Sequence, residues 1–338
     1  MNISIISFTD RGRAVSKKIA KARTSDEIRQ YAKADGFLAY DNVKQFAQTA
    51  MQQSDALIFI GAAGIAVRAC APFLQGKDKD PAVVVIDENA KFVISLLSGH
   101  IGGANRLTAQ LAELLQAIPV ITTATDGRGV FAADTWAVEH GCIVKNKEQI
   151  KYISGAILRG EKIGLQTEYP IIGTLPEQIQ PCRDAQNGIV VSTRKQTEQK
   201  FIHTLHLIPR IVHIGVGCKR NTPPERLQAW VDTQLDALQL DAWSVADISS
   251  IDLKRDEQAV LQLAEHYNVP VFFYHAQELE AVKGDFPPSA FVRKTTGTDN
   301  VCQRSAAKAS KNGRCLLKKT AQDGMTLSIY EENWSAEF

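Results

Sequence analysis

The 338-residue sequence lacks the patterns that mark several large classes of protein. Its six cysteines are scattered, with no C-x-x-C pair and no histidine at zinc-ligand spacing, so we expect neither a metal site nor a disulfide framework. No apolar stretch approaches the roughly 18 residues that cross a bilayer, and no signal peptide is recognisable. With a net charge of only +2 and no block of basic residues, nucleic acid is not an expected partner. We therefore expect a cytoplasmic protein with reduced thiols and no membrane association.

Two histidines, His203 and His206, have a ligand-like spacing in the run FIHTLHLI. The run is typical of a strand, on which residues three apart face opposite sides of the sheet. We therefore expect no metal ion between them.

The chain does show apolar runs of strand length that alternate with helical stretches, an α/β pattern. In its first part these runs occupy residues 3–8, 56–60, 82–86, 92–97 and 120–122. The segment VVVIDENAKFVISLL predicts a hairpin, and hence a mixed sheet. Because the length exceeds what one core usually organises, we predict an N-terminal α/β domain (1–140), a small loop-rich middle domain (141–209) and a C-terminal α/β domain (210–338).

The motif SGHIGGAN, residues 98–105, joins a predicted strand to an amphipathic helix. Three glycines in eight residues favour positive φ angles or a close backbone approach. The amides at the start of such a helix suit a carboxylate or phosphate, with His100 beside them. The same residues also fit a tight turn in which the histidine only caps or packs, and spacing alone does not decide between the two.

A second small-residue turn, Gly61-Ala-Ala-Gly64, follows the predicted strand 56–60 and precedes a helix that carries Arg68. Ligands in open α/β sheets bind beyond the carboxyl ends of the strands, so this turn and SGHIGGAN are expected to line one mouth. Alternatively, Gly61 and Gly64 only allow a helix to pack closely on the sheet.

A third turn contains Gly215, Gly217, Lys219 and Arg220, which together suggest an anion site. Thr222 and Glu225 fit a capping box with Pro223 at the first helical position. The complete glycine fingerprint of a dinucleotide site is missing, so a bound NAD is not expected.

Several of these segments together resemble the cobalt-precorrin 5A hydrolase family of anaerobic cobalamin biosynthesis, also called CbiG. The resemblance rests on GAAGIAVRACAPFL, DPAVVVIDENAKFVISLLSGHIGGANRLTAQLA, PVITTATD and HIGVGCKRNTPPERL, and it covers essentially the whole chain. It implies hydrolytic opening of the δ-lactone of cobalt-precorrin 5A, with loss of the meso carbon and its methyl group as acetaldehyde. The substrate brings its own cobalt, so the resemblance implies no resident cofactor. Neighbouring methyltransferases of the pathway are the further partners it suggests.

Lactone hydrolysis needs a water molecule, a base and donors for the developing oxyanion. We assign the catalytic roles to His100 and to Asp126, which would orient the histidine or act as base, and we consider the amides of Gly102 and Gly103 as oxyanion donors. No G-x-S-x-G signature is present, which favours direct attack by water. The residues predicted to bind the carboxylate-rich substrate are Gly61, Gly64, Arg68, Ser98, Gly99, Gly102, Gly103, Asn105, Arg106, Thr123, Gly215, Gly217, Lys219 and Arg220.

Two departures from the family pattern and two rival functions remain. Gln303 stands where the family is expected to have glutamate, which puts an acid role there in doubt, and the segment 281–300 is locally divergent.

The first rival is a non-catalytic corrinoid-binding module, because the C-terminal third resembles a stand-alone protein of the aerobic pathway. The second, a phosphate or nucleotide binder, rests only on the glycine turns.

The absence of a ligand cluster and of a complete nucleotide motif predicts a protein that works without added metal or nucleotide. Chelator-treated protein should release acetaldehyde from cobalt-precorrin 5A as fast as untreated protein. A loss of turnover that added zinc restores would contradict this expectation.

Overall fold

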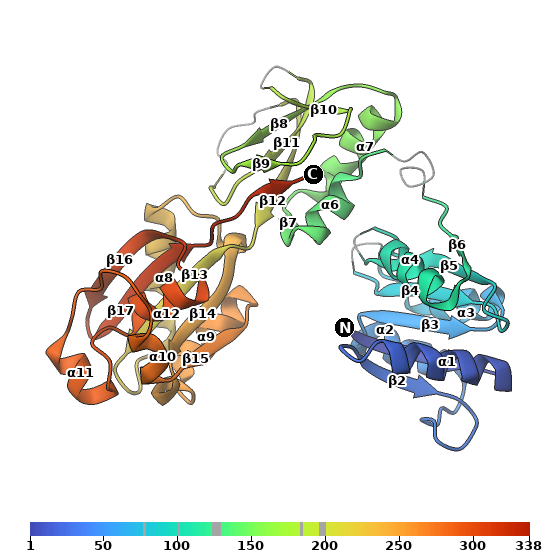
Figure 1. Ribbon diagram of the computed structural model, residues 1–338, viewed down its shortest axis with the longest axis horizontal. Helices are drawn as coiled ribbons and strands as arrows, with labels where there is room; N and C mark the ends of the chain where they lie inside the picture. The colour runs from blue at the N-terminus through green and yellow to red at the C-terminus, as the bar shows by residue number, and fades with distance from the viewer. Residues whose placement is uncertain (77–78, 101, 124–129, 183–184, 196–200) are drawn as a thin grey trace. The chain divides into compact units, whose positions relative to one another are not determined.

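A computed structural model describes residues 1–76, 79–100, 102–123, 130–182, 185–195 and 201–338. The chain divides into two compact units, Met1–Trp136 and Ala137–Phe338. Figure 1 shows the elements of each unit. In the described part of the chain, no helix has both the length and the apolar character needed to cross a membrane.

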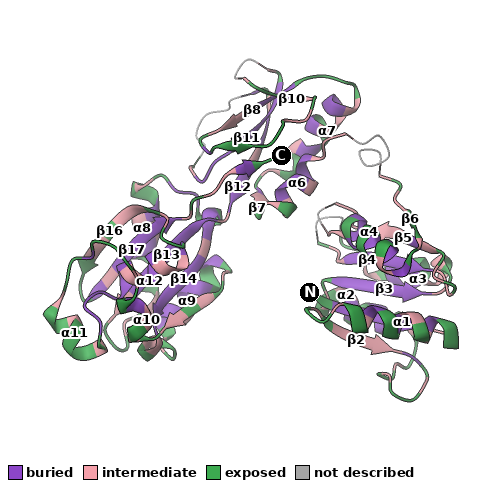
Figure 2. Cartoon of the chain, in the orientation of Figure 1, coloured by how far each residue is buried: buried purple, intermediate pink, exposed green. Residues whose placement is uncertain are grey.

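The first unit is a six-stranded sheet of order β2-β1-β3-β4-β5-β6 with helices on both faces. Its elements are β1 (Asn2–Ser7), α1 (Asp10–Ala22), β2 (Glu27–Tyr31), α2 (Val43–Gln53), β3 (Ala56–Ile60), α3 (Ala63–Cys70), the 3-10 turn η1 (Ala71–Phe73), β4 (Ala82–Ile86), β5 (Phe92–Leu97), α4 (Ala104–Leu115) and β6 (Ile118–Val120), with α6 (Ala133–Glu139) at the unit boundary. Every residue of β3 and β4 is buried, as Figure 2 shows, which explains their unbroken apolar sequences. Helices α1 and α4 pack on one face, and α2 and α3 pack on the other.

The predicted hairpin is confirmed, and it makes the sheet mixed. Strands β2, β1, β3 and β4 are parallel, whereas β5 runs antiparallel to β4 and β6 follows the direction of β5. Asp87 closes the turn, because its carboxylate accepts hydrogen bonds from the amides of Asn89 (3.1 Å) and Phe92 (2.6 Å). The reversal sends the end of β5 to the edge of the sheet where β4 begins.

The first part of the second unit is more regular than its composition suggests. It contains β7 (Cys142–Val144), the 3-10 turn η2 (Lys147–Gln149), α7 (Ile150–Leu158), β8 (Ile163–Thr167), β9 (Ile171–Ile172), β10 (Ile179–Pro181), β11 (Asn187–Val191) and β12 (His203–Pro209). Five of these strands form a sheet of order β10-β8-β11-β12-β7. Gly164 and Gly188 are paired residues of this sheet, and a Cβ on either would lie 2.4 Å from the ring of Phe201. These glycines leave room for a buried phenyl ring in a sheet.

The rest of the second unit is an α/β layer, as predicted. Its elements are β13 (Val212–Cys218), α8 (Pro224–Ala237), η3 (Ala242–Ser244), β14 (Val245–Ile251), η4 (Asp252–Lys254), α9 (Gln258–Tyr267), β15 (Val271–Tyr274), α10 (Ala276–Glu280), α11 (Ala290–Thr296), α12 (Cys302–Ala309), β16 (Arg314–Gln322), β17 (Met325–Glu331) and β18 (Ala336–Glu337). The sheet order is β15-β14-β13-β17-β16. Helices α8 and α9 contribute to the apolar core on this sheet, and α12 packs on β13, β14 and β17.

Contacts near the C-terminus tie the two sheets of the second unit together. The buried carboxylate of Glu331, at the end of β17, accepts hydrogen bonds from the hydroxyls of Tyr169 (3.2 Å) and Thr193 (3.0 Å). Farther along, β18 pairs in parallel with β9. These contacts explain why residues 137–338 form one compact unit although they contain two large sheets.

The predicted capping box at the start of α8 is wrong. The hydroxyl of Thr222 donates to the carbonyl of Lys219 (2.8 Å), and the extended Pro223 is the N-cap. A residue that precedes a proline is disfavoured in the helical region, so Pro224 holds Pro223 outside the helix. The helix therefore begins one residue later than predicted.

Gly215 is required where α12 crosses β13. A Cβ at this position would lie 1.8 Å from the carbonyl oxygen of Cys302. We expect Gly215→Ala to lower the free energy of unfolding of the second unit by about 1 to 3 kcal/mol or more, because the helix must shift. Denaturant titration measures this loss.

Gly155→Ala is the matched control in the same unit. Its new Cβ would meet only the flexible end of Arg159, at 3.2 Å, and alanine favours a helix over glycine by up to about 1 kcal/mol. Equal stability of the two variants would show that α12 does not depend on Gly215.

Candidate functional site

The SGHIGGAN segment forms a tight loop between β5 and α4. Ser98 has a φ of 57° and Gly103 a φ of 82°, both in the left-handed region. Gly99 and Gly102 are needed for space, since a Cβ on Gly99 would lie 2.8 Å from the Asn105 amide oxygen and one on Gly102 would lie 2.4 Å from the Ser98 Cβ. The glycines therefore serve both uses that the sequence predicted, a positive φ and a close approach.

Several backbone amides of this loop donate hydrogen bonds to carbonyl oxygens of the same loop. Gly103 N–H donates to the carbonyl of His100 (3.0 Å), Ala104 N–H to that of Ser98 (3.1 Å) and Asn105 N–H to that of Gly99 (2.9 Å). The prediction that the Gly103 amide serves as an oxyanion donor is therefore wrong in this conformation. The oxyanion role of the Gly102 amide stays a prediction.

Asn105 connects the loop to two neighbouring segments. Its buried side chain accepts a hydrogen bond from the Ser95 hydroxyl of β5 (2.6 Å) and donates one to the Thr123 hydroxyl after β6 (3.0 Å). Asn105 and Thr123 were both predicted as substrate-binding residues, and the structure brings them together. Ser95 is a partner that the sequence did not reveal.

His100 contacts a residue that sequence reasoning missed. Its Nδ1 lies 2.7 Å from the hydroxyl oxygen of Thr135 in α6, 35 residues later in the chain. No local pattern marks a threonine in the first turn of a helix as a histidine partner, so only the fold reveals the pair. Asp126, the other predicted catalytic residue, lies outside the described residues.

The second glycine turn, Gly61 to Gly64, lies at the opposite edge of the sheet from His100. The prediction that the two turns line one ligand-binding site is therefore wrong. Gly61 donates to the carbonyl of Ile86 (2.8 Å) at the end of β4, whereas Gly102 lies next to Asp80, just before β4 begins. Six residues of strand separate these points by roughly 20 Å. The antiparallel β5 is the cause, because it carries SGHIGGAN to the opposite edge of the sheet.

The two basic residues predicted to bind substrate in the first unit also lie at opposite edges of the sheet. Arg68 lies in α3, with its guanidinium over Gly64. Arg106 is exposed on the first turn of α4, beside Gly103, and therefore lies at the edge that carries His100. Of the two, Arg106 is placed to meet an anion that approaches the histidine.

The third turn already contains an anion of its own. Glu257 accepts a hydrogen bond from the Asn221 amide (3.0 Å) and pairs with Lys254 (2.9 Å). The aliphatic stem of Lys219 packs over Gly324. Gly217 faces Thr326, where a Cβ would lie 2.7 Å from the threonine hydroxyl, so both glycines of the turn have packing roles. Arg220 stays exposed in a pocket that Asp256 and Glu257 also line.

Gln303 is a structural residue in the second unit. It is buried, its amide nitrogen donates to the Tyr330 hydroxyl (3.2 Å), and its amide oxygen accepts from the Lys319 amide (3.2 Å). Both ends of the side chain are occupied inside the protein, which leaves it no role as an acid.

The environment of four thiols disfavours a cysteine nucleophile. Burial raises the pKa of Cys70 and of Cys302 to about 11 and that of Cys142 to about 12. Burial also raises the pKa of Cys218, at the end of β13. These thiols stay protonated at neutral pH, and the thiolate is the reactive form.

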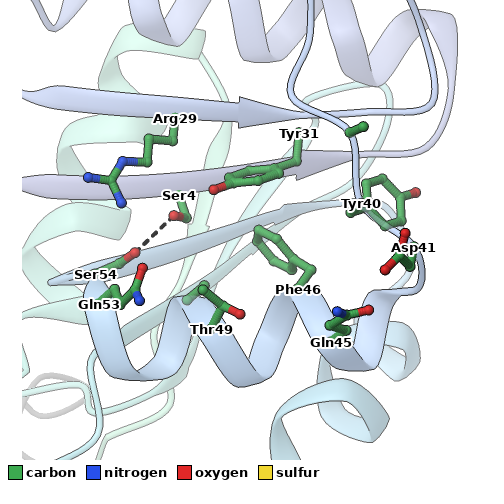
Figure 3. A pocket seen from close by; sticks show the side chains of 12 residues that line it. Ser4, Arg29, Tyr31, Tyr40, Asp41, Gln45, Phe46, Thr49, Gln53 and Ser54 are labelled. Carbon is green, nitrogen blue, oxygen red and sulfur yellow. Dashed lines mark hydrogen bonds between the residues drawn. The ribbon is translucent and has the colours of Figure 1, made fainter.

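A pocket of about 220 Å³ lies between α2 and the edge strand β2 (Figure 3). Tyr31 and Phe46 form an edge-to-face pair there, with ring centroids 5.0 Å apart, and Ser4 binds Ser54 at 2.8 Å. Arg29 also lines it. None of the predicted site residues lines this pocket.

Comparison with known proteins finds matches to most of the chain. Three family descriptions match in order: Cobalamin synthesis G N-terminal (residues 45–126), Cobalamin biosynthesis central region (131–209) and Cobalamin synthesis G C-terminus (212–330). A cobalt-precorrin-5A hydrolase of Salmonella typhimurium is 36% identical over 97% of this chain and 97% of its own length. The chain belongs to the cobalt-precorrin-5A hydrolase (CbiG) family.

Two further relatives of this CbiG-family chain differ in how much of the chain they match. A cobalt-precorrin-5A hydrolase of Priestia megaterium is 29% identical over 96% of this chain and 94% of its own length. Protein CobE of a Sinorhizobium species is 33% identical over 28% of this chain and 61% of its own length.

The hydrogen bonds of Asn105 predict a measurable contribution to stability. Asn105→Ala should lower the free energy of unfolding of the first unit by about 1 to 3 kcal/mol, because it leaves the hydroxyls of Ser95 and Thr123 without this partner. Thermal or denaturant unfolding measures the change.

Thr108→Val on the same helix is the matched control. Among the described residues the buried Thr108 hydroxyl has no hydrogen-bond partner, so its removal should leave stability unchanged or slightly higher. A loss as large in Thr108→Val as in Asn105→Ala would contradict the proposed importance of the network.

Proposed function

We propose that this CbiG-family chain is a cobalt-precorrin-5A hydrolase that opens the δ-lactone of its substrate with water and releases acetaldehyde. The observation that carries the proposal is the SGHIGGAN loop, which fixes a histidine at the edge of the α/β sheet in a chain that matches its hydrolase relatives over almost their full length. A histidine can take up and release a proton near neutral pH, as hydrolysis requires.

The chain's own residues would divide the work of hydrolysis as follows. His100 accepts a proton from water as the water oxygen bonds to the lactone carbonyl carbon. The ring carbon–oxygen bond then breaks, and the leaving oxygen takes the proton back, which gives a carboxylic acid and an alcohol. Acetaldehyde leaves when this alcohol loses its O–H proton and the carbon–carbon bond to the macrocycle breaks, with the electron pair of that bond kept by the macrocycle. The Gly102 amide would donate to the developing oxyanion. Arg106, beside the loop, would pair with a carboxylate of the substrate.

Asp126 and the C-terminal residues have supporting roles in this proposal. Asp126 would act on the attacking water or through His100. Lys219 and Arg220 are exposed cations that would bind substrate carboxylates without taking part in the chemistry.

We propose no resident metal or organic cofactor, and a cytoplasmic location. The proposed location is supported by six free cysteines, none of them in a disulfide.

The alternative is a corrinoid carrier without catalytic activity. The similarity to protein CobE is the specific observation behind it, but that similarity covers only 28% of the chain. Purified protein incubated with cobalt-precorrin 5A distinguishes the two. A hydrolase releases acetaldehyde, and a carrier returns its ligand unchanged.

Replacement of His100 by alanine tests the assignment of the base. Loss of a general base typically costs about 100- to 10,000-fold in rate, so His100→Ala should bind the cobalt macrocycle and release acetaldehyde far more slowly. The measurement combines acetaldehyde release with the visible spectrum of the bound corrinoid.

Lys219→Ala is the contrasting variant. It should weaken binding and leave single-turnover chemistry near that of the unchanged protein. Near-normal turnover by His100→Ala would remove the histidine from the mechanism, and a collapse of chemistry in Lys219→Ala would contradict its binding role.

A further inference from the structure

We propose that Thr135 is a positioning residue for His100, an inference that rests on the proposed function. In this proposal the Thr135 hydroxyl accepts a hydrogen bond from Nδ1–H of the imidazole, which leaves the lone pair on Nε2. A neutral imidazole has one protonated nitrogen and one acceptor nitrogen, so an Nδ1 that donates to the hydroxyl leaves Nε2 to take a proton from water.

Both partners are held in place by the surrounding backbone. The carbonyl of His100 accepts the Gly103 amide at 3.0 Å, which fixes the loop that carries the ring. Thr135 lies in the first turn of α6, where its amide donates to the carboxylate of the buried Asp134 (3.1 Å). The Nδ1 to hydroxyl distance of 2.7 Å is that of a well-formed hydrogen bond. The ring is therefore held from its backbone and from its Nδ1 atom.

The choice of a hydroxyl has a chemical consequence. His213 and His275 in the same chain each place Nδ1 at 2.6 Å from an aspartate, Asp247 and Asp252 respectively. A carboxylate partner stabilises the imidazolium form, whereas a neutral hydroxyl orients the ring with much less stabilisation of the cation. A base that must return its proton to the leaving oxygen in the same turnover gains from the neutral partner.

The same contact narrows the role of Asp126. Nδ1 makes one hydrogen bond in the plane of the ring, and Thr135 occupies that position. Of the two roles considered for Asp126, orienting His100 through Nδ1 is therefore disfavoured. The other role, direct action of Asp126 on the attacking water, is left.

The test uses the full-length protein with three single substitutions, two at Thr135 and one at a control threonine. Thr135→Val keeps the shape of the side chain and removes the hydroxyl, and Thr135→Ser keeps the hydroxyl. Thr233→Val is the control, because that exposed helical threonine donates only to the Ala229 carbonyl (2.7 Å) in α8. Acetaldehyde release gives kcat and KM across pH, and nitrogen-15 NMR of histidine-labelled protein without substrate reports the tautomer of His100.

We expect Thr135→Val to lower kcat about 10- to 100-fold with KM changed less than about threefold, a smaller loss than removal of the base because the imidazole remains. Its His100 nitrogen signals should move toward a mixture of tautomers. Thr135→Ser should restore both the rate and the signals, and Thr233→Val should match the unchanged protein.

Failure of this inference is distinguishable from failure of the proposed function. An inactive His100→Ala together with a fully active Thr135→Val, or a Thr135→Ser no better than Thr135→Val, overturns the positioning role alone. Unchanged NMR signals in Thr135→Val overturn it as well. A fully active His100→Ala removes the proposed base and the role of Thr135 with it.

Discussion

The antiparallel pairing of β4 with β5 is the constraint on which the candidate site depends. Asp87 closes the turn between these strands, and the reversal carries SGHIGGAN to the edge where β4 begins. If β5 were parallel to β4, His100 would emerge beside Gly61 and Arg68. Instead it emerges at the edge that also bears Asn105 and Thr123. A single hairpin thus decides which residues can act together.

Backbone amides in the glycine turns of this chain donate to acceptors within the protein, which the sequences of these turns do not reveal. In the first unit loop carbonyls accept amides at the start of α4, and in the second unit Glu257 accepts the Asn221 amide. A helix start attracts an external anion only where its amides lack an internal acceptor. In the proposed function the substrate carboxylates are therefore met mainly by exposed side chains such as Arg106 and Lys219, and the proposed oxyanion donor is the Gly102 amide.

Family membership and geometry support the proposal in different ways. The match over nearly the full length of the Salmonella relative supports the reaction, which no spacing of residues could supply. The structure adds the surroundings of the histidine, namely a loop closed on itself and a hydroxyl at Nδ1. Together they support the proposed activation of water by an oriented imidazole, and the raised pKa values of four thiols argue against a thiolate at those positions.

The sequence by itself determined the α/β class, the strands 56–60, 82–86 and 92–97, and the hairpin, because period and turn chemistry are local. It missed the sheet of the middle region, since Gly164 and Gly188 resemble loop residues until Phe201 packs on them. Only the tertiary structure placed Gly61 and His100 at opposite edges and brought Thr135 to His100. The reason is physical: strand direction and contacts between residues far apart in the chain arise from packing, which no local pattern encodes.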